Sequence, residues 1–130
     1  MVTISFGLDT VAVEFTFDAK IDNNSERVKF YKTLYGFKDI QKGKRVYVRE
    51  GVLSGIRHLR PTRSTVIVSR RDSRIVRNFL KKNKGVKFDE KMVILGEGEG
   101  RALGLNQPTG WKRIYEELKG NENTVFSVDF

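Results

Sequence analysis

Residues 64–85 decide the fold, and they read STVIVSRRDSRIVRNFLKKNKG. The run Thr65–Val68 is rich in β-branched residues, which is typical of a strand buried on both faces. Ser69 and the three residues after it then have the spacing of a helix capping box, with Asp72 in place of the usual Glu, and Gly85 is a typical helix stop. We therefore predict a strand over residues 64–69 and a helix over residues 70–84.

The alternation of strand and helix continues toward the C-terminus. Lys91–Leu95 reads as a strand, residues 96–104 as a glycine-rich flexible turn, and Thr124–Phe130 as a final strand. The helix before that last strand starts at Pro108 or Thr109, and its apolar face is formed by Trp111, Ile114, Tyr115 and Leu118. This β-α-β-α-β order predicts a mixed α/β fold in which the second half forms one sheet with packed helices.

The first half of the chain supplies the rest of the predicted sheet. Apolar residues alternate with polar ones over Val2–Phe6 and Val11–Phe17, so these segments read as an antiparallel hairpin that extends the sheet. A helix over Glu26–Tyr35 and a strand over Arg45–Arg49 follow. The chain has 130 residues and shows no linker or repeat, so we expect one compact domain over residues 1–130.

The composition excludes several kinds of site. The chain has no Cys, which removes disulfides, thiolate ligands and thiol nucleophiles, and His58 is its only histidine, so neither a structural zinc site nor a Ser-His-Asp triad can be argued. We expect no metal, no cofactor and no catalytic residue. The longest apolar runs are far shorter than the roughly 20 residues that cross a bilayer, so we expect a cytoplasmic protein without a membrane partner.

Positive charge is concentrated in the middle of the chain. The formal net charge is +9, but residues 41–85 contain fourteen basic and two acidic residues, a net charge of +12, whereas the remaining residues carry −3. On the predicted helix, five cations fall within a stripe about 80° wide, and Ile75, Val76, Phe79 and Leu80 fall on the opposite side. With its apolar side against the sheet, the helix would turn a cationic side without acidic neighbours to solvent.

Such a stripe fits the phosphates of a nucleic acid, because a polyanion relieves the repulsion among like charges and releases its own counterions. A basic arm over residues 57–63 and a basic turn before the strand Arg45–Arg49 add to it. The predicted contacts are Arg70, Arg71, Arg74, Arg77, Lys81, Lys82 and Lys84 on the helix, Arg57, Arg60 and Arg63 in the arm, and Lys42, Lys44 and Arg45 in the turn. The sequence leaves the choice between DNA and RNA open.

Two other functions remain as alternatives. The first alternative is a metal-dependent nuclease, because a strand face carries Glu14, Asp18 and Lys20, and Asp9 precedes them. A resemblance to nucleases of the PD-(D/E)xK type would imply that these carboxylates hold Mg²⁺. The other is an interaction protein whose partner has an acidic face. The strand Phe126–Phe130 could also pair across a homodimer.

Residues 30–37, FYKTLYGF, followed by residues 45–53, RVYVREGVL, resemble short basic proteins of hyperthermophilic archaea. The resemblance covers the first half of the chain. It implies an archaeal, cytoplasmic origin and no particular activity.

Overall fold

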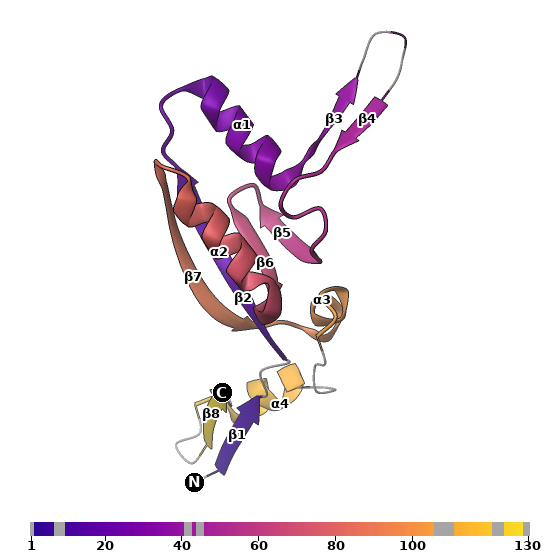
Figure 1. Ribbon diagram of the computed structural model, residues 1–130. Helices are drawn as coiled ribbons and strands as arrows, with labels where there is room; N and C mark the ends of the chain where they lie inside the picture. The colour runs from indigo at the N-terminus through magenta and orange to yellow at the C-terminus, as the bar shows by residue number, and fades with distance from the viewer. Residues whose placement is uncertain are drawn as a thin grey trace.

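The computed structural model describes residues 2–6, 10–40, 43, 46–105, 111–120 and 124–128. The described residues form eight strands and four α-helices, arranged as Figure 1 shows, with a 3₁₀ turn, η2, leading into the second helix. Their bounds are β1 Val2–Phe6, β2 Val11–Ala19, α1 Asn24–Tyr35, β3 Phe37–Ile40, β4 Val46–Arg49, β5 His58–Thr62, β6 Thr65–Ser69, η2 Arg70–Asp72, α2 Ser73–Lys82, β7 Val86–Ile94, α3 Glu97–Ala102, α4 Trp111–Leu118 and β8 Thr124–Val128. The predicted mixed α/β class is confirmed.

The main sheet has four antiparallel strands in the order β5-β6-β2-β7. Strand β2 is central and pairs with β6 from Ala12↔Ser69 to Thr16↔Thr65 and with β7 from Val11↔Ile94 to Ala19↔Val86. Strands β6 and β7 therefore run parallel to each other with β2 between them, and α2 connects them. The predicted strand, helix and strand are confirmed, but the two strands are not neighbours.

The predicted N-terminal hairpin is wrong. Both of its strands form, but β1 pairs in parallel with β8, and β2 lies in the main sheet. The predicted single sheet is wrong for the same reason, because the last strand belongs to a separate two-stranded sheet. Alternating apolar residues report that a strand is half-buried and say nothing about which partner it takes. Pairing of β8 across a dimer stays a prediction.

Helices α1 and α2 cover one face of the main sheet, and the larger core lies between them and it. Phe15 and Phe17 of β2 belong to this core, and the rings of Phe30 and Phe79 stack at 5.4 Å between the helices. Strand β6 is buried on both faces, as predicted: Val66 and Val68 point into the larger core, and Ile67 packs on the other face with Ala12, Leu95 and Leu103.

Strands β3 and β4 form a two-stranded ribbon that projects from the main sheet (Figure 1). Its base is fixed where Gly36, at a φ of 79°, meets Gly51: a Cβ on Gly36 would lie 2.5 Å from the carbonyl oxygen of Arg49. Ile40 and Val48 are 74% and 72% exposed on the same side of the ribbon. The predicted basic turn falls between the two strands, and Lys42, Lys44 and Arg45 lie outside the described residues.

The glycine-rich stretch 96–104 is not the predicted flexible turn, because residues 97–102 form α3. Its end carries Gly104 at a φ of 74°. Leu103 is buried and closes the second core cluster. Within the part of the chain that the structure describes, no helix is both long enough and apolar enough to cross a membrane.

Candidate nucleic-acid interface

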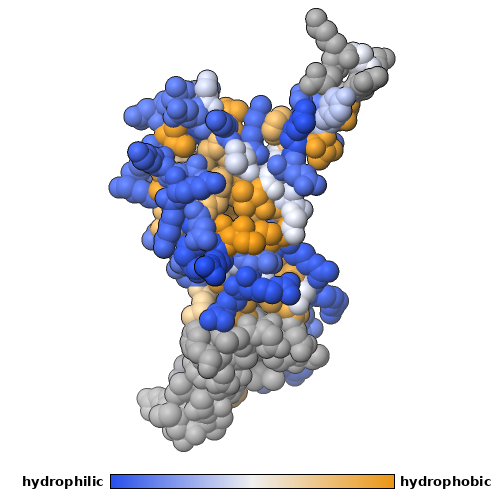
Figure 2. All heavy atoms as spheres, in the orientation of Figure 1, coloured by the Kyte–Doolittle hydropathy of each residue, from blue (hydrophilic) through white to orange (hydrophobic). Residues whose placement is uncertain are grey.

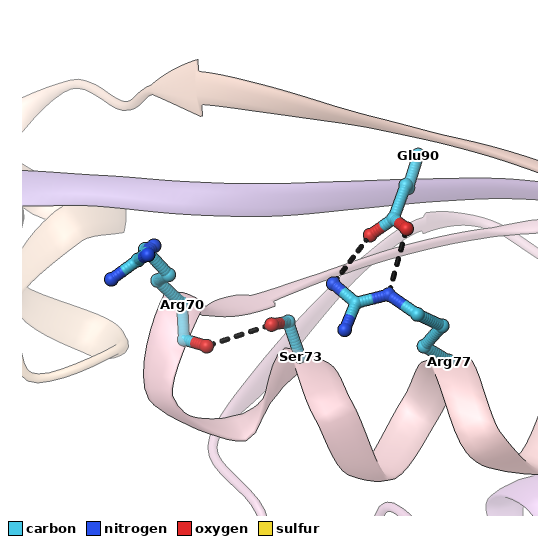
Figure 3. A network of polar contacts seen from close by, with 4 residues as sticks. All are labelled: Arg70, Ser73, Arg77 and Glu90. Carbon is cyan, nitrogen blue, oxygen red and sulfur yellow. Dashed lines mark hydrogen bonds and ion pairs between the residues drawn. The ribbon is translucent and has the colours of Figure 1, made fainter. Parts of the chain in front are cut away.

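The predicted basic helix is a 3₁₀ turn, η2, followed by α2. The Ser69 hydroxyl donates to the Asp72 carboxylate at 3.1 Å, so the capping box does not form with the backbone. The Ser73 hydroxyl donates instead to the carbonyl oxygen of Arg70 at 2.7 Å, which ties the turn to the helix (Figure 3). The helix ends at Lys82, earlier than predicted, because the Asn83 side chain caps it by donating to a carbonyl of the last turn.

Helix α2 separates apolar from basic residues much as predicted. Val76, Phe79 and Leu80 are buried in the larger core, but Ile75, predicted beside them, is 49% exposed. The side chains of the basic residues are turned outward. The exposed ones are Arg70, Arg71, Arg74, Lys81, Lys82 and Lys84. Lys84 follows the end of the helix and so does not extend its stripe.

The basic residues at the start of the helix line an open groove of about 830 Å³ between η2, α2 and strand β7. The helical side of the groove carries Arg70, Arg71, Ser73, Arg74 and Arg77, and the β7 side carries Glu90, Lys91 and Met92. Val13 of the central strand also lines it. The lining of this groove therefore includes four guanidinium groups and one carboxylate.

That carboxylate corrects the prediction that the stripe has no acidic neighbour. Arg77 donates to both oxygens of Glu90, through Nε to Oε1 at 2.7 Å and through Nη2 to Oε2 at 2.8 Å (Figure 3). The hydrogen bonds from Arg77 lower the pKa of Glu90, and the same bonds raise the pKa of Arg77. Glu90 pairs in register with Phe15, so it lies on the face of the sheet that α2 covers.

The other cations of the helix are compensated less, although the charge of Lys81 also contributes to the lowered pKa of Glu90. Across the described residues, no carboxylate lies within ion-pair distance of Arg70, Arg74 or Lys81. Arg71 reaches Asp72 only at 4.0 Å, with its side chain 88% exposed, and such a contact contributes little. One cation of the predicted stripe is thus neutralised and the rest remain available.

The predicted arm over residues 57–63 is an edge strand. Strand β5 pairs with β6 from His58↔Val68, with an irregularity between Leu59 and Thr62. His58 is held by its Nδ1, which lies 2.8 Å from the carbonyl oxygen of Ile56. Arg57 packs against Gly104 of the α3 end, where its guanidinium would contact an added Cβ. The arm is therefore ordered and presents Arg60 and Arg63 from fixed main-chain positions.

The side chains of these two arginines lie over the rings of two tyrosines of α1. The Arg60 guanidinium carbon lies 3.6 Å from the centre of the Tyr35 ring, and that of Arg63 lies 4.0 Å from the Tyr31 ring. The two rings are parallel to within 9° at 6.3 Å. Sequence reasoning missed this arrangement, although the spacing of the tyrosines by four residues places them on one face of a helix.

The carboxylates of the nuclease alternative do not gather. Glu14 and Asp18 lie four residues apart on β2, which separates them by about 13 Å, and Lys91 approaches Glu14 at 3.9 Å. Lys20 follows the strand, and Asp9 lies outside the described residues. Among those that are described, no three His, Asp or Glu side chains are placed to hold one metal ion.

Comparison of the chain with known protein families, with curated proteins and with solved structures gave no match. The archaeal resemblance of the first half therefore stays a prediction from its residues.

Proposed function

We propose that this protein binds nucleic acid through its phosphates, with the groove between α2 and β7 as the main contact and without a chemical reaction of its own. The observation that carries the proposal is the set of exposed cations along η2 and α2, of which, within the described residues, only Arg77 forms a close ion pair. DNA and RNA both present this charge. The apolar side of α2 packs in the core, so the helix cannot also insert into a lipid surface.

The physical argument is electrostatic. Arginine forms paired hydrogen bonds with phosphate oxygens, and η2 with α2 places four arginines along one groove. Each phosphate that such a cation neutralises releases condensed counterions, which makes affinity fall steeply with salt. With Arg77 neutralised by Glu90, we expect about four to six phosphates to be engaged, and a slope of log affinity against log salt of about −4 to −5 on duplex DNA.

The test is a salt titration of binding to labelled duplex DNA, single-stranded DNA and structured RNA. A double charge reversal on α2, Arg74→Glu in the groove with Lys81→Glu farther along the helix, should reduce the slope strongly. The matched control reverses two exposed cations elsewhere, Lys38→Glu on the ribbon and Arg101→Glu on α3, and should leave most of the slope intact. Absence of binding at low salt, or a slope near zero, would refute the proposal.

The two alternatives give different results in the same experiment. A nuclease would shorten the labelled strands when Mg²⁺ or Mn²⁺ is added, whereas we expect them to stay intact. A protein that recognises an acidic partner surface would show little affinity for heterologous nucleic acid at physiological salt.

A further inference from the structure

A second cationic surface lies at the opposite edge of the sheet from the α2 groove. It consists of Tyr31 and Tyr35 of α1, with Arg60 of β5 and Arg63 of the following turn, and we call it the Tyr–Arg shelf. Each guanidinium covers one tyrosine ring. The Tyr35 hydroxyl donates to the main-chain carbonyl of Arg63 at 2.7 Å, which fixes the helix to the turn.

The two arginines of the shelf are ordered but not neutralised. Both are exposed, and over the described part of the chain no carboxylate lies within ion-pair distance of either. A tyrosine face attracts a cation without cancelling its charge. Arg77 in the groove is the contrasting case, because Glu90 compensates it. Arg60 and Arg63 have therefore already lost side-chain freedom, which lowers the entropic cost of binding a ligand.

The shape of the ligand follows from the shape of the guanidinium. This group is planar: its edges donate hydrogen bonds, and its two faces stack on flat π systems. In the shelf, each guanidinium carbon lies over a tyrosine ring, at a distance that suits stacking. A guanidinium stacked on a ring by one face can take a second planar group on the other, and its edges can take a phosphate. A nucleotide offers both, but in a duplex the base faces are already stacked on each other.

We propose that the Tyr–Arg shelf binds unpaired bases of single-stranded nucleic acid by stacking them on Arg60 and Arg63. This inference rests on the proposed function and adds its substrate class. Helices α1 and α2 cover the same face of the sheet, so the shelf and the groove lie on one side of the molecule. Figure 2 shows an apolar area in the middle of this side, next to the charged surface, and unstacked bases also have apolar faces to cover.

The experiment replaces the planar guanidinium groups of the shelf with ammonium groups and keeps their charge. Arg60→Lys with Arg63→Lys retains both cations, so a shelf that only contacted phosphates would be little affected, whereas a stacking shelf would lose its platform. Binding is measured to a single-stranded oligonucleotide containing 2-aminopurine and to a blunt duplex of equal length. We expect single-strand affinity to fall about tenfold and the quenching of 2-aminopurine to be lost. Duplex affinity should stay within about twofold.

The matched control is Arg49→Lys on the ribbon. Arg49 also lies over a tyrosine, Tyr47, at 5.4 Å, but Asp39 neutralises it at 3.3 Å. This variant should bind both oligonucleotides like the unmodified protein. If the double variant melts at a lower temperature, Arg63→Lys alone replaces it, and a partial loss of quenching is expected because Arg60 is retained.

The outcomes separate the two proposals. Unchanged single-strand affinity and quenching in the lysine variants, with salt-dependent binding intact, would overturn the stacking inference and leave the proposed function standing. An equal loss on the single strand and on the duplex would also overturn it, because the contribution of the shelf would then not depend on unpaired bases. If the unmodified protein binds neither oligonucleotide at low salt, both proposals fail.

Discussion

Glu90→Gln should tighten the binding of duplex DNA, although the substitution lies on a strand and not on the basic helix. In the structure, Glu90 accepts two hydrogen bonds from Arg77 and neutralises it inside a groove lined by three further arginines. Glutamine keeps nearly the same shape but carries no charge. Arg77 then becomes one more cation that can neutralise a phosphate.

The size of the effect follows from counterion release. One additional neutralised phosphate should steepen the slope of log affinity against log salt by about 0.9. Relative to a reference at 1 M salt, this corresponds to about 1 kcal/mol at about 0.15 M salt, or about fivefold tighter binding. Fluorescence anisotropy with a labelled blunt duplex, over a salt range of about 0.05 to 0.3 M, resolves both the affinity and the slope.

Asp89→Asn is the matched control, because it removes the same charge from the neighbouring residue. Asp89 pairs in register with Thr16 and faces away from α2, so its charge is outside the groove. We expect a change of less than about twofold and an unchanged slope. If Asp89→Asn has the same effect as Glu90→Gln, net charge alone explains the result and the groove is not the contact. A Glu90→Gln slope equal to that of the unmodified protein would also refute the reasoning.

Four other outcomes are expected. Reversing Arg74 and Lys81 to Glu should weaken duplex binding about thirtyfold or more at about 0.15 M salt, with an unchanged circular dichroism spectrum, since both side chains are exposed. Leu80→Ala, at a fully buried position, should lower the free energy of unfolding by about 2–5 kcal/mol in a urea titration. Burial is the main cause that raises the pKa of Tyr35, and its hydroxyl donates to the carbonyl oxygen of Arg63, so Tyr35→Phe should cost about 1 kcal/mol in the same assay. The pKa of Glu90 lies below its ordinary 4.5, so its ion pair stabilises the fold fully above that pH, and this stabilisation is lost as the pH falls through the lowered pKa. In urea titrations, the free energies of unfolding of the unmodified protein and of Glu90→Gln should therefore become equal in acid.

Local patterns predicted the elements well where every signal lay within a few residues. Gly36, directly after α1, has a φ of 79°, a conformation that glycine adopts without strain, so the end of this helix is readable from sequence. Gly85, predicted as the stop of the basic helix, also has a positive φ, 82°, but α2 has already ended at Lys82. Asn23 caps α1 through its side chain, which accepts from the backbone N–H groups of Ser25 and Glu26. It is a residue type that favours this position.

Contacts between distant segments were not readable, and the ion pair in the groove is the clearest case. The strand was predicted to begin at Lys91, but β7 begins at Val86. With the correct start, Phe88, Glu90 and Met92 alternate onto the face that α2 covers, so the acidic neighbour of the helix could have been expected. The Tyr–Arg shelf was missed because residues 57–63 read as a basic arm and not as a strand, and the pairing of β5 with β6 brings its arginines to α1.

The central position of β2 has a consequence for how the basic helix can be used. A chain shortened to begin after β4 would still contain η2, α2 and every groove residue except Val13. It would lack β2, the strand that pairs with both β6 and β7. Val66 and Val68 would lose Phe15 as a companion in the core, and the ladder hydrogen bonds on both sides would be unmade. The basic helix would therefore not keep its cationic surface as an isolated peptide. That surface forms only when β2, from the first part of the chain, pairs between β6 and β7.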